Sequence, residues 1–327
     1  MRTDPIHAVL AMALTLVALS SLPAQAQEWP KAHPIRLVVP ASAGSTPDLT
    51  SRKLAVFLQE RMKQGVIVEN RPGAAGTIAM QSVATAKPDG YTLGFGNIVT
   101  MAINRSLIPK MPYNPDKDLA PVAVLTQVPN VLVVRKGLPI NSVRDLIIYA
   151  KSHPDRLSMG SGGNGTTSHL SGEILKEVAD ISFTHIPYRG APQAQADLIG
   201  GSIDFMFDNL PSMTGAIQSG QVRPLAVTSR KRSALLPNVP TMEESGLQGF
   251  EVVAWGGIVA PAGTPRPIVQ RLNREINAWL QSPAAREEFA KFGQVPLGGT
   301  PEFFRAHIDA ETKKWGDVIR KAGVKLD

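Results

Sequence analysis

The chain has 327 residues, which is enough for two domains of ordinary size or one large one. Its hydrophobic fraction of 43% excludes a disordered chain, and the absence of cysteine excludes disulfides, thiolate nucleophiles and cysteine-bound metal sites. The net charge of +7 suits an anionic ligand, but basic and acidic residues are interspersed and no nucleic-acid-binding motif accompanies them, so we expect no nucleic-acid partner.

The N-terminus has the pattern of a secretory signal peptide. An apolar run at 8–22 is followed by Pro23 and by "AQA" at 24–26, a small-residue cleavage site. The run is shorter than the roughly 20 residues that a membrane span needs. We therefore predict that residues 1–26 are a signal peptide cleaved near Ala26, and that the mature protein is exported and soluble.

The rest of the chain alternates between short apolar runs and helical patterns. The apolar runs predict strands at 35–39, 66–69, 91–95, 130–135, 183–186, 203–207 and 252–259. Amphipathic spacing and helix-start residues predict helices at 47–62, 143–152, 168–178, 193–199, 267–281, 283–291 and 301–322. This alternation predicts an α/β architecture with largely parallel sheets.

Three turns in this order share one local pattern: a strand, a turn rich in small residues, and a helix start. They lie at 38–49, where Thr46 is a good N-cap, at 158–170, where Thr166 or Thr167 is the N-cap, and at 187–198, where Pro192 suits a helix start. Ligands of open α/β sheets bind beyond the carboxyl ends of the strands, where such turns gather. Because helix N-termini present unpaired N–H groups, three of them together would form an anion site.

The sequence supports an enzyme less well than it supports a binding site for an anion. Gly160, Gly162 and Gly165 have the G-x-G-x-x-G spacing of a dinucleotide-binding turn, but the segment before them is short and polar, and no acidic residue ends the next predicted strand. The chain has no Gly-Lys pair for a P-loop and no G-x-S-x-G nucleophile turn. His169 and His185 are candidate bases beside the candidate nucleophiles Ser161 and Ser168, so an exported hydrolase stays open as an alternative. Histidine spacing indicates no metal site.

Long stretches of the chain resemble one family from about Pro34 to the C-terminus. They read "HPIRLVVPASAGSTPDLTSRKLA", "VIVENRPGAAGTIAMQSVATAKPDGYTLGFG", "LSMGSGGNGTTSHLSGEI", "IPYRGAPQAQADLIGGSIDFMFDN", "NVPTMEESGLQGFE" and "WGGIVAPAGTPRPIVQRLN". They resemble the Bug family of extracytoplasmic solute receptors, the binding subunits of tripartite tricarboxylate transporters.

The resemblance implies a two-lobed periplasmic binding protein of the type II class, with a mixed, mostly parallel sheet flanked by helices in each lobe. Lobe one would comprise 27–128 and 250–327, and lobe two 129–249. Such a receptor is periplasmic, has no catalytic residues and no cofactor, and closes on a small organic acid or amino acid. Its partners would be the integral membrane subunits of the transporter, and we expect a monomer. Presentation of the solute to a membrane sensor is an alternative role for the same fold.

The resemblance also implies a set of ligand contacts. In the first lobe these are Ala43, Gly44, Thr46 and Asp48, and in the second lobe they are Ser161, Gly162, Asn164, Gly165, Thr166, Tyr188 and Asp208. Other roles stay open for three of them: helix-start stabilisation for Asp48, turn formation for Asp208 and packing for Tyr188. Ser45 stands where the family typically has a second glycine, and Pro47 stiffens the next helix start, so both positions bear on ligand choice.

Overall fold

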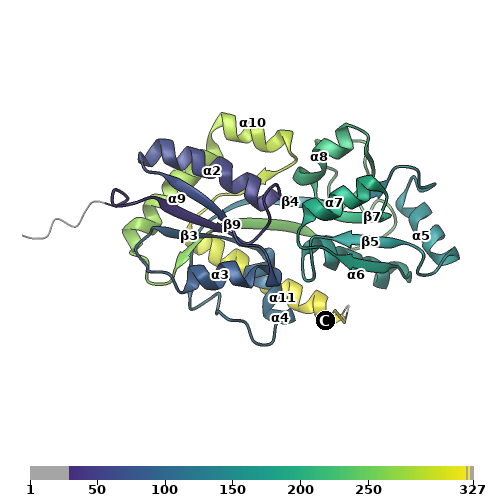
Figure 1. Cartoon of the computed structure of the whole chain (residues 1–327), viewed down its shortest axis with the longest axis horizontal. Coiled ribbons are helices and arrows are strands. Elements are labelled where there is room, and N and C mark those ends of the chain that lie inside the picture. The colour runs from purple at the N-terminus through teal and green to yellow at the C-terminus, as the bar shows by residue number, and fades with distance from the viewer. Residues whose placement is uncertain (1–28, 322, 325–327) are drawn as a thin grey trace, which may run out of the picture.

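The computed structural model describes residues 29–321 and 323–324. The predicted signal peptide, 1–26, lies outside these residues. The molecule is elongated, with helices covering both faces of a mixed sheet that has two sections side by side along the long axis (Figure 1). Within the described part of the chain, no helix is long and apolar enough to cross a membrane.

One section of the sheet is built mainly from the N-terminal strands. Three parallel strands stand in the order β2-β1-β3, and β9 joins β3 and the long β4 in antiparallel fashion. Their bounds are β1 Ile35–Val39, β2 Val66–Asn70, β3 Thr92–Asn97, β9 Val253–Pro261 and β4 Leu119–Arg135, with the two-residue β10 Val295–Pro296 also paired to β4. Among the described strands, four pairs are parallel and five are antiparallel, and every antiparallel pair involves β4 or β9. The predicted mixed α/β architecture is confirmed, although parallel pairs do not outnumber antiparallel ones.

The other section is formed by the middle of the chain. Parallel β6 and β7 flank β5, and β4 pairs antiparallel with β7 and β8. The bounds are β5 Ser158–Ser161, β6 Thr184–Pro187, β7 Phe205–Asn209 and β8 Val222–Val227. Strand β4 therefore runs through both sections: up to Pro129 it pairs with β9, and from Asn130 it pairs with β7.

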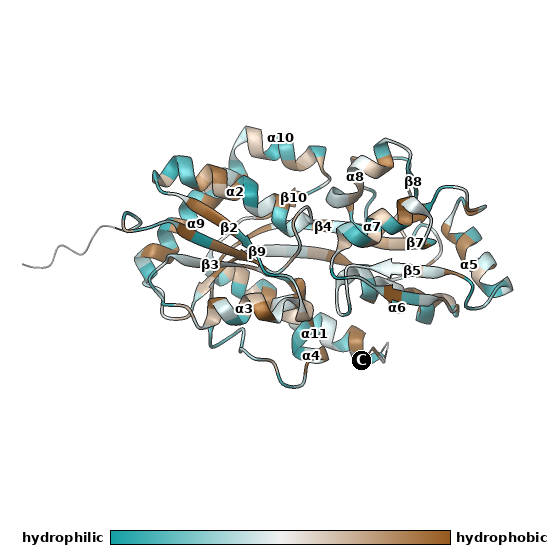
Figure 2. Ribbon diagram, in the orientation of Figure 1, coloured by the Kyte–Doolittle hydropathy of each residue, from teal (hydrophilic) through white to brown (hydrophobic). Residues whose placement is uncertain are grey.

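Helices pack on both sides of these strands, and Figure 2 shows apolar residues concentrated on the strands and on the inner helix faces. The helices of the first section are α2 Thr46–Met62, α3 Thr77–Ala84, α4 Asn104–Leu107, α9 Arg266–Gln281, α10 Pro283–Lys291 and α11 Pro301–Lys321. Those of the second are α5 Val143–Ser152, α6 Thr167–Ala179, α7 Ala191–Gly200 and α8 Leu210–Gln218. Buried side chains form three clusters between helices and strands. The hydrophobic core therefore extends along both sections of the sheet.

Two strand predictions need correction. The segment at Gly160 is strand β5, although the sequence before it is polar. The Ser158 amide donates to the Asp204 carboxylate at the start of this strand, and Met159 is fully buried. A Cβ on Gly160 would collide with Ile203, which explains the small residue in this strand. The first half of β4 was missed because Pro121 and Pro129 interrupt it, and the pairing with β9 shifts register next to Pro121. Helices α3, α4 and α8, the short 3₁₀ and π turns and strands β8 and β10 were also not predicted.

Candidate functional site

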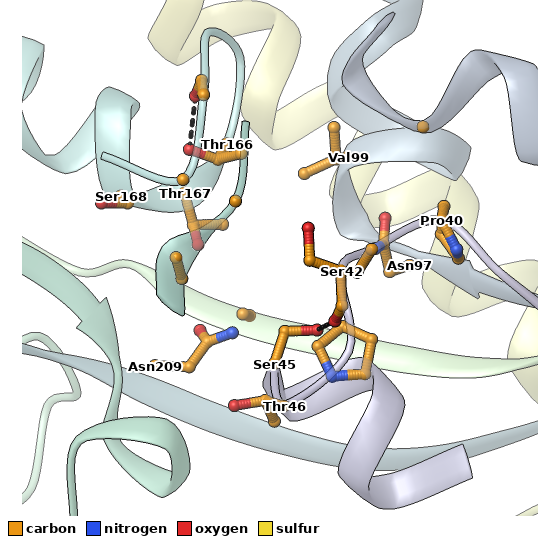
Figure 3. A pocket seen from close by; sticks show the side chains of 18 of the residues that line it. Pro40, Ser42, Ser45, Thr46, Asn97, Val99, Thr166, Thr167, Ser168 and Asn209 are labelled. Atoms are coloured by element: carbon orange, nitrogen blue, oxygen red, sulfur yellow. Dashed lines mark hydrogen bonds between the residues drawn. The ribbon is translucent and has the colours of Figure 1, made fainter. Parts of the chain in front are cut away.

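A cavity of about 690 Å³ lies where the two sections of the sheet meet. One side is lined by the β1–α2 loop, by 72–76 and by 97–100, and the other by 162–164, 166–168, 187–191 and 208–209. Strands β4 and β9 contribute the floor through Thr126, Val128 and 254–256. Figure 3 shows side chains from both sides turned toward the same space. Its size is that of a pocket for a small organic molecule.

The first residues of several helices surround this cavity. Residues at the start of α2, α6 and α7 line it, as the three-turn pattern of the sequence predicts. The N-cap residues Gly76 of α3 and Asn209 of α8 line it as well. The amides of a first helical turn have no partner within the helix, and each N-terminus carries about half a positive charge. The cavity is therefore surrounded by hydrogen-bond donors and positive partial charge, and no buried cationic side chain is among its described lining residues.

Two polar atoms of the lining have no partner. Thr46 Oγ1 and Asn209 Oδ1 are buried, and neither makes a hydrogen bond to any residue from 29 to 324 that the structure describes. Thr46 is 7% exposed and begins α2, and both side chains belong to the cavity lining. Because a buried unpaired polar group costs on the order of 1–3 kcal/mol, such groups at a cavity indicate a place for a polar ligand.

The ionisable groups of the lining are few. Among the described lining residues, Arg189 has the one cationic side chain and Asp208 the one carboxylate. Arg189 is exposed, whereas Asp208 is 5% exposed. Burial raises the pKa of Asp208, and its hydrogen bonds from Gln195, the Asn209 amide and Ser212 counteract only part of this effect.

Six of the predicted contact residues line the cavity: Thr46, Gly162, Asn164, Thr166, Tyr188 and Asp208. Tyr188 is held by its hydroxyl, which donates to Asp197 Oδ2 over 2.6 Å. Thr166 is the N-cap of α6, and its hydroxyl oxygen accepts a hydrogen bond from the His169 amide. The structure thus brings together residues from both groups of predicted contacts.

The other predicted residues do not line the cavity: Ala43, Gly44, Asp48, Ser161 and Gly165. In the β1–α2 loop the Gly44 amide donates to Asp48 Oδ2 over 2.9 Å, so this amide is already used. Asp48 Oδ1 also accepts from Asn70 Nδ2, and Arg52 pairs with the same carboxylate. Burial alone would raise the pKa of Asp48, but the hydrogen bonds from Arg52, Gly44 and Asn70 hold it below its usual value. Asp48 therefore fixes the loop from behind.

The β5–α6 turn has the same kind of internal support. Gly165 donates its amide to His169 Nδ1 over 3.1 Å, and the ring of His169 stacks on that of His185 at 4.3 Å. Ser161 Oγ lies 2.7 Å from His185 Nε2, is fully buried and accepts from the Gly163 amide. Burial, and secondarily the neighbouring His169, lower the pKa of His185 to about 4. The two histidines thus support the turn from the side away from the cavity.

This geometry argues against the hydrolase alternative. Ser161 is bonded to a histidine but does not line the cavity. Ser168 lines the cavity, but its hydroxyl donates to the backbone carbonyl of Phe207. A nucleophilic serine needs both access to the substrate and a base within hydrogen-bond reach, and neither residue combines them. In the part of the chain that the structure describes, no group of three His, Asp or Glu side chains is placed to hold a metal ion.

Several lining residues were not predicted from the sequence. They are Ser42, residues 73–76, Asn97, Thr100, Asn209 and Trp255. Residues 73–76 all have positive φ, two of them being alanines, and this turn presents Gly76 as the N-cap of α3. The "PGAAG" pattern was a usable signal for such a turn. Trp255 is 4% exposed and donates its indole N–H to Glu311.

Comparison with known proteins gives a consistent result. The family model described as "Tripartite tricarboxylate transporter family receptor" matches residues 50–324. Protein BugT of Bordetella pertussis is 37% identical over 305 residues, which cover 93% of this chain and 93% of BugT.

Among solved structures, Rpa4515 of R. palustris with adipate superposes with a TM-score of 0.89 at 38% identity, covering 91% of this chain and 99% of that one. MatC from Rhodopseudomonas palustris with bound malate gives 0.84 at 33% identity, covering 88% and 99%. The periplasmic binding protein BugD gives 0.87 at 36% identity, covering 90% and 99%. The fold of this chain is that of these periplasmic solute-binding proteins.

A side chain at Gly162 should disturb the lining of the cavity. A Cβ there would lie 3.2 Å from the Ala191 amide nitrogen, so the branched chain of Gly162→Val must displace the start of α7 or project into the lining. We expect Gly162→Val to abolish ligand binding while circular dichroism and thermal unfolding without ligand stay close to wild type. Gly215→Val is the matched control, because a Cβ on Gly215 meets no atom within 4 Å. Wild-type affinity in Gly162→Val would contradict the assignment of this turn to the site.

The buried His185 should make the protein sensitive to acid. Its pKa falls from 6.5 in the unfolded chain to about 4 in the folded one, so between these values the unfolded chain binds the extra proton. The free energy of unfolding should therefore fall as the pH decreases from about 6.5 to about 4. His185→Gln should lose less of it over this range. Urea unfolding of both proteins at several pH values measures the difference, and parallel curves would contradict the placement of a neutral His185 behind the turn.

Proposed function

The chain belongs to the family of tripartite tricarboxylate transporter receptors, and from this premise we propose that it captures a small organic carboxylate in the cavity and delivers it to the membrane subunits of such a transporter. Members of this family are solute-binding receptors rather than enzymes. The observation that carries the proposal is the convergence of helix N-termini on a cavity whose lining contains the unpaired hydroxyl of Thr46.

The energetics favour an anionic ligand of this kind. Taking a carboxylate out of water costs several kcal/mol. A hydrogen bond to a charged group returns about 1.5–3 kcal/mol, so three or four donors offset that cost. The first-turn amides of α2, α6 and α8, with the hydroxyl of Thr46, supply this number. Charge-assisted donors on both sides of the cavity also suit a second polar group at the far end of the ligand.

Ligand size agrees with the relatives. Rpa4515 is described with adipate and MatC with malate, both small dicarboxylates. A cavity of about 690 Å³ accommodates molecules of this size together with bridging waters. We propose a mono- or dicarboxylate as the ligand, with Thr46, Gly162, Asn164, Thr166, Tyr188 and Asp208 among its contacts. Ser45, Asn97 and Asn209 join this set because they line the same space. Gly44, Asp48, Ser161 and Gly165 support it from behind, whereas Ala43 is exposed and outside the lining.

The chain would work as two lobes, 27–128 with 250–327 and 129–249. The exchange of partners along β4 at Pro129 and Asn130 supports this division. Thr228 supports it too. Two segments cross between the proposed lobes, β4 near Asn130 and the chain before β9 near Val252, and the Thr228 hydroxyl bonds to both of them. Movement about these segments would open and close the cavity. With the predicted signal peptide removed, the mature protein would act as a monomer in the periplasm.

A thermal-shift panel tests this function. Purified mature protein should be stabilised by adipate, malate or a related carboxylate with micromolar-scale affinity, and a ligand at about 100 times its Kd should add about 2.7 kcal/mol to the free energy of unfolding. The uncharged diamide of each hit is the matched control and should give no shift, because the amides of the site select a negative charge. Stabilisation by a nicotinamide dinucleotide alone would overturn the receptor assignment.

A further inference from the structure

The two rims of the cavity touch each other at one point. Ser42, in the β1–α2 loop, donates its hydroxyl hydrogen to the backbone carbonyl oxygen of Arg189 over 3.3 Å. Arg189 precedes Gly190, the N-cap of α7, and all three residues line the cavity. The contact joins residues 147 positions apart in the sequence and brings together the β1–α2 loop and the β6–α7 turn.

The backbone of Gly190 does not itself require glycine. Its φ of 170° and ψ of 157° are extended, a conformation open to any residue. A Cβ at this position would nevertheless lie 3.0 Å from the Cβ of Ser42 and still closer to its Oγ. The constraint on residue 190 therefore comes from the opposite rim.

The same two segments approach each other at a second point. A Cβ on Gly44 would lie 3.9 Å from Cγ of Pro192, which is ordinary van der Waals contact. The rims are thus packed closely around Ser42 and Gly190, and a ligand in the cavity cannot leave past this point without separating them.

We propose that Ser42 and Gly190 form a closing contact that retains the ligand, with the missing side chain of Gly190 allowing the rims to meet. The inference rests on the proposed function, because it assigns these residues to ligand retention at the same site. A side chain on residue 190 leaves the ligand-binding amides in place but favours the open state. Because the ligand binds tightly only to the closed state, the apparent affinity falls in proportion to the population of that state.

A steric rescue tests the contact. Gly190→Ala should weaken binding of adipate or malate, whichever the wild type prefers, by roughly tenfold, which corresponds to about 1.4 kcal/mol. The change should appear as faster dissociation in stopped-flow measurements. Adding Ser42→Gly removes the opposing Cβ and Oγ, so the double variant should regain most of the lost affinity. Unchanged affinity in Gly190→Ala, or no recovery in the double variant, would overturn the proposal.

A crosslink tests the contact without any ligand. The chain has no cysteine, so Ser42→Cys with Gly190→Cys introduces a single possible disulfide. The expected Cβ separation of 3.0 Å is slightly below the usual 3.5–4.5 Å of a disulfide, so a small parting of the rims suffices. With oxidised glutathione the pair should form an intramolecular bond, measured as loss of titratable thiols. Ser42→Cys with Gly201→Cys, at the other end of α7, is the matched control and should keep both thiols.

The outcomes separate the two claims. If the rims do not meet, both thiols of Ser42→Cys with Gly190→Cys stay titratable and the closing contact is wrong, whatever the wild type binds. If the wild type binds no carboxylate but the disulfide forms, the proposed ligand class fails together with the retention role, while the rim contact itself stands as geometry. If carboxylates bind and the disulfide forms, ligand exchange should stop until a reductant is added, and free exchange in the oxidised protein would overturn the retention role.

Discussion

Binding an anion out of water without a fixed counter-charge is the constraint on which the rest of this structure depends. The single cation in the described lining, Arg189, is exposed, and the single carboxylate, Asp208, is buried with a raised pKa. Neutral donors must then carry the stabilisation. Helix N-termini meet this requirement, since their amides are unpaired by construction and the helix dipole adds positive potential. The gathering of helix starts around one cavity follows from this need.

Donors of this kind are useful only if they are held in place before the ligand arrives. The structure does this with side chains that face away from the cavity. Asp48 binds the Gly44 amide and Asn70 behind the β1–α2 loop, and His169 binds the Gly165 amide behind the β5–α6 turn. Prolines in the first turn of α2, α7 and α8 fix the backbone where each helix begins. Preorganisation lowers the entropy that binding would otherwise lose.

The sequence predicted most of the architecture because helix starts and apolar periodicity are local signals. Helices α5 and α10 have the predicted bounds, and α2 begins one residue earlier, at Thr46. The misses have local causes as well: β5 is polar, and prolines interrupt the first half of β4. For the cavity, the three glycine- and proline-rich turns were recognisable. The sequence did not show which of their atoms face the cavity. The amides of Gly44 and Gly165 donate instead to the side chains of Asp48 and His169, and only the folded structure reveals these bonds.

Residues that reach the cavity from distant segments gave even less signal. Asn209 lines it because β7 ends at the junction of the two sheet sections, and Trp255 lines it because β9 passes that junction.

The most direct test of the account is a crystal structure with a bound carboxylate. The account predicts carboxylate oxygens within about 3.2 Å of first-turn amide nitrogens from α2 and from α6 or α8. A carboxylate held instead by the Arg189 guanidinium alone, with those amides bonded elsewhere, would contradict it.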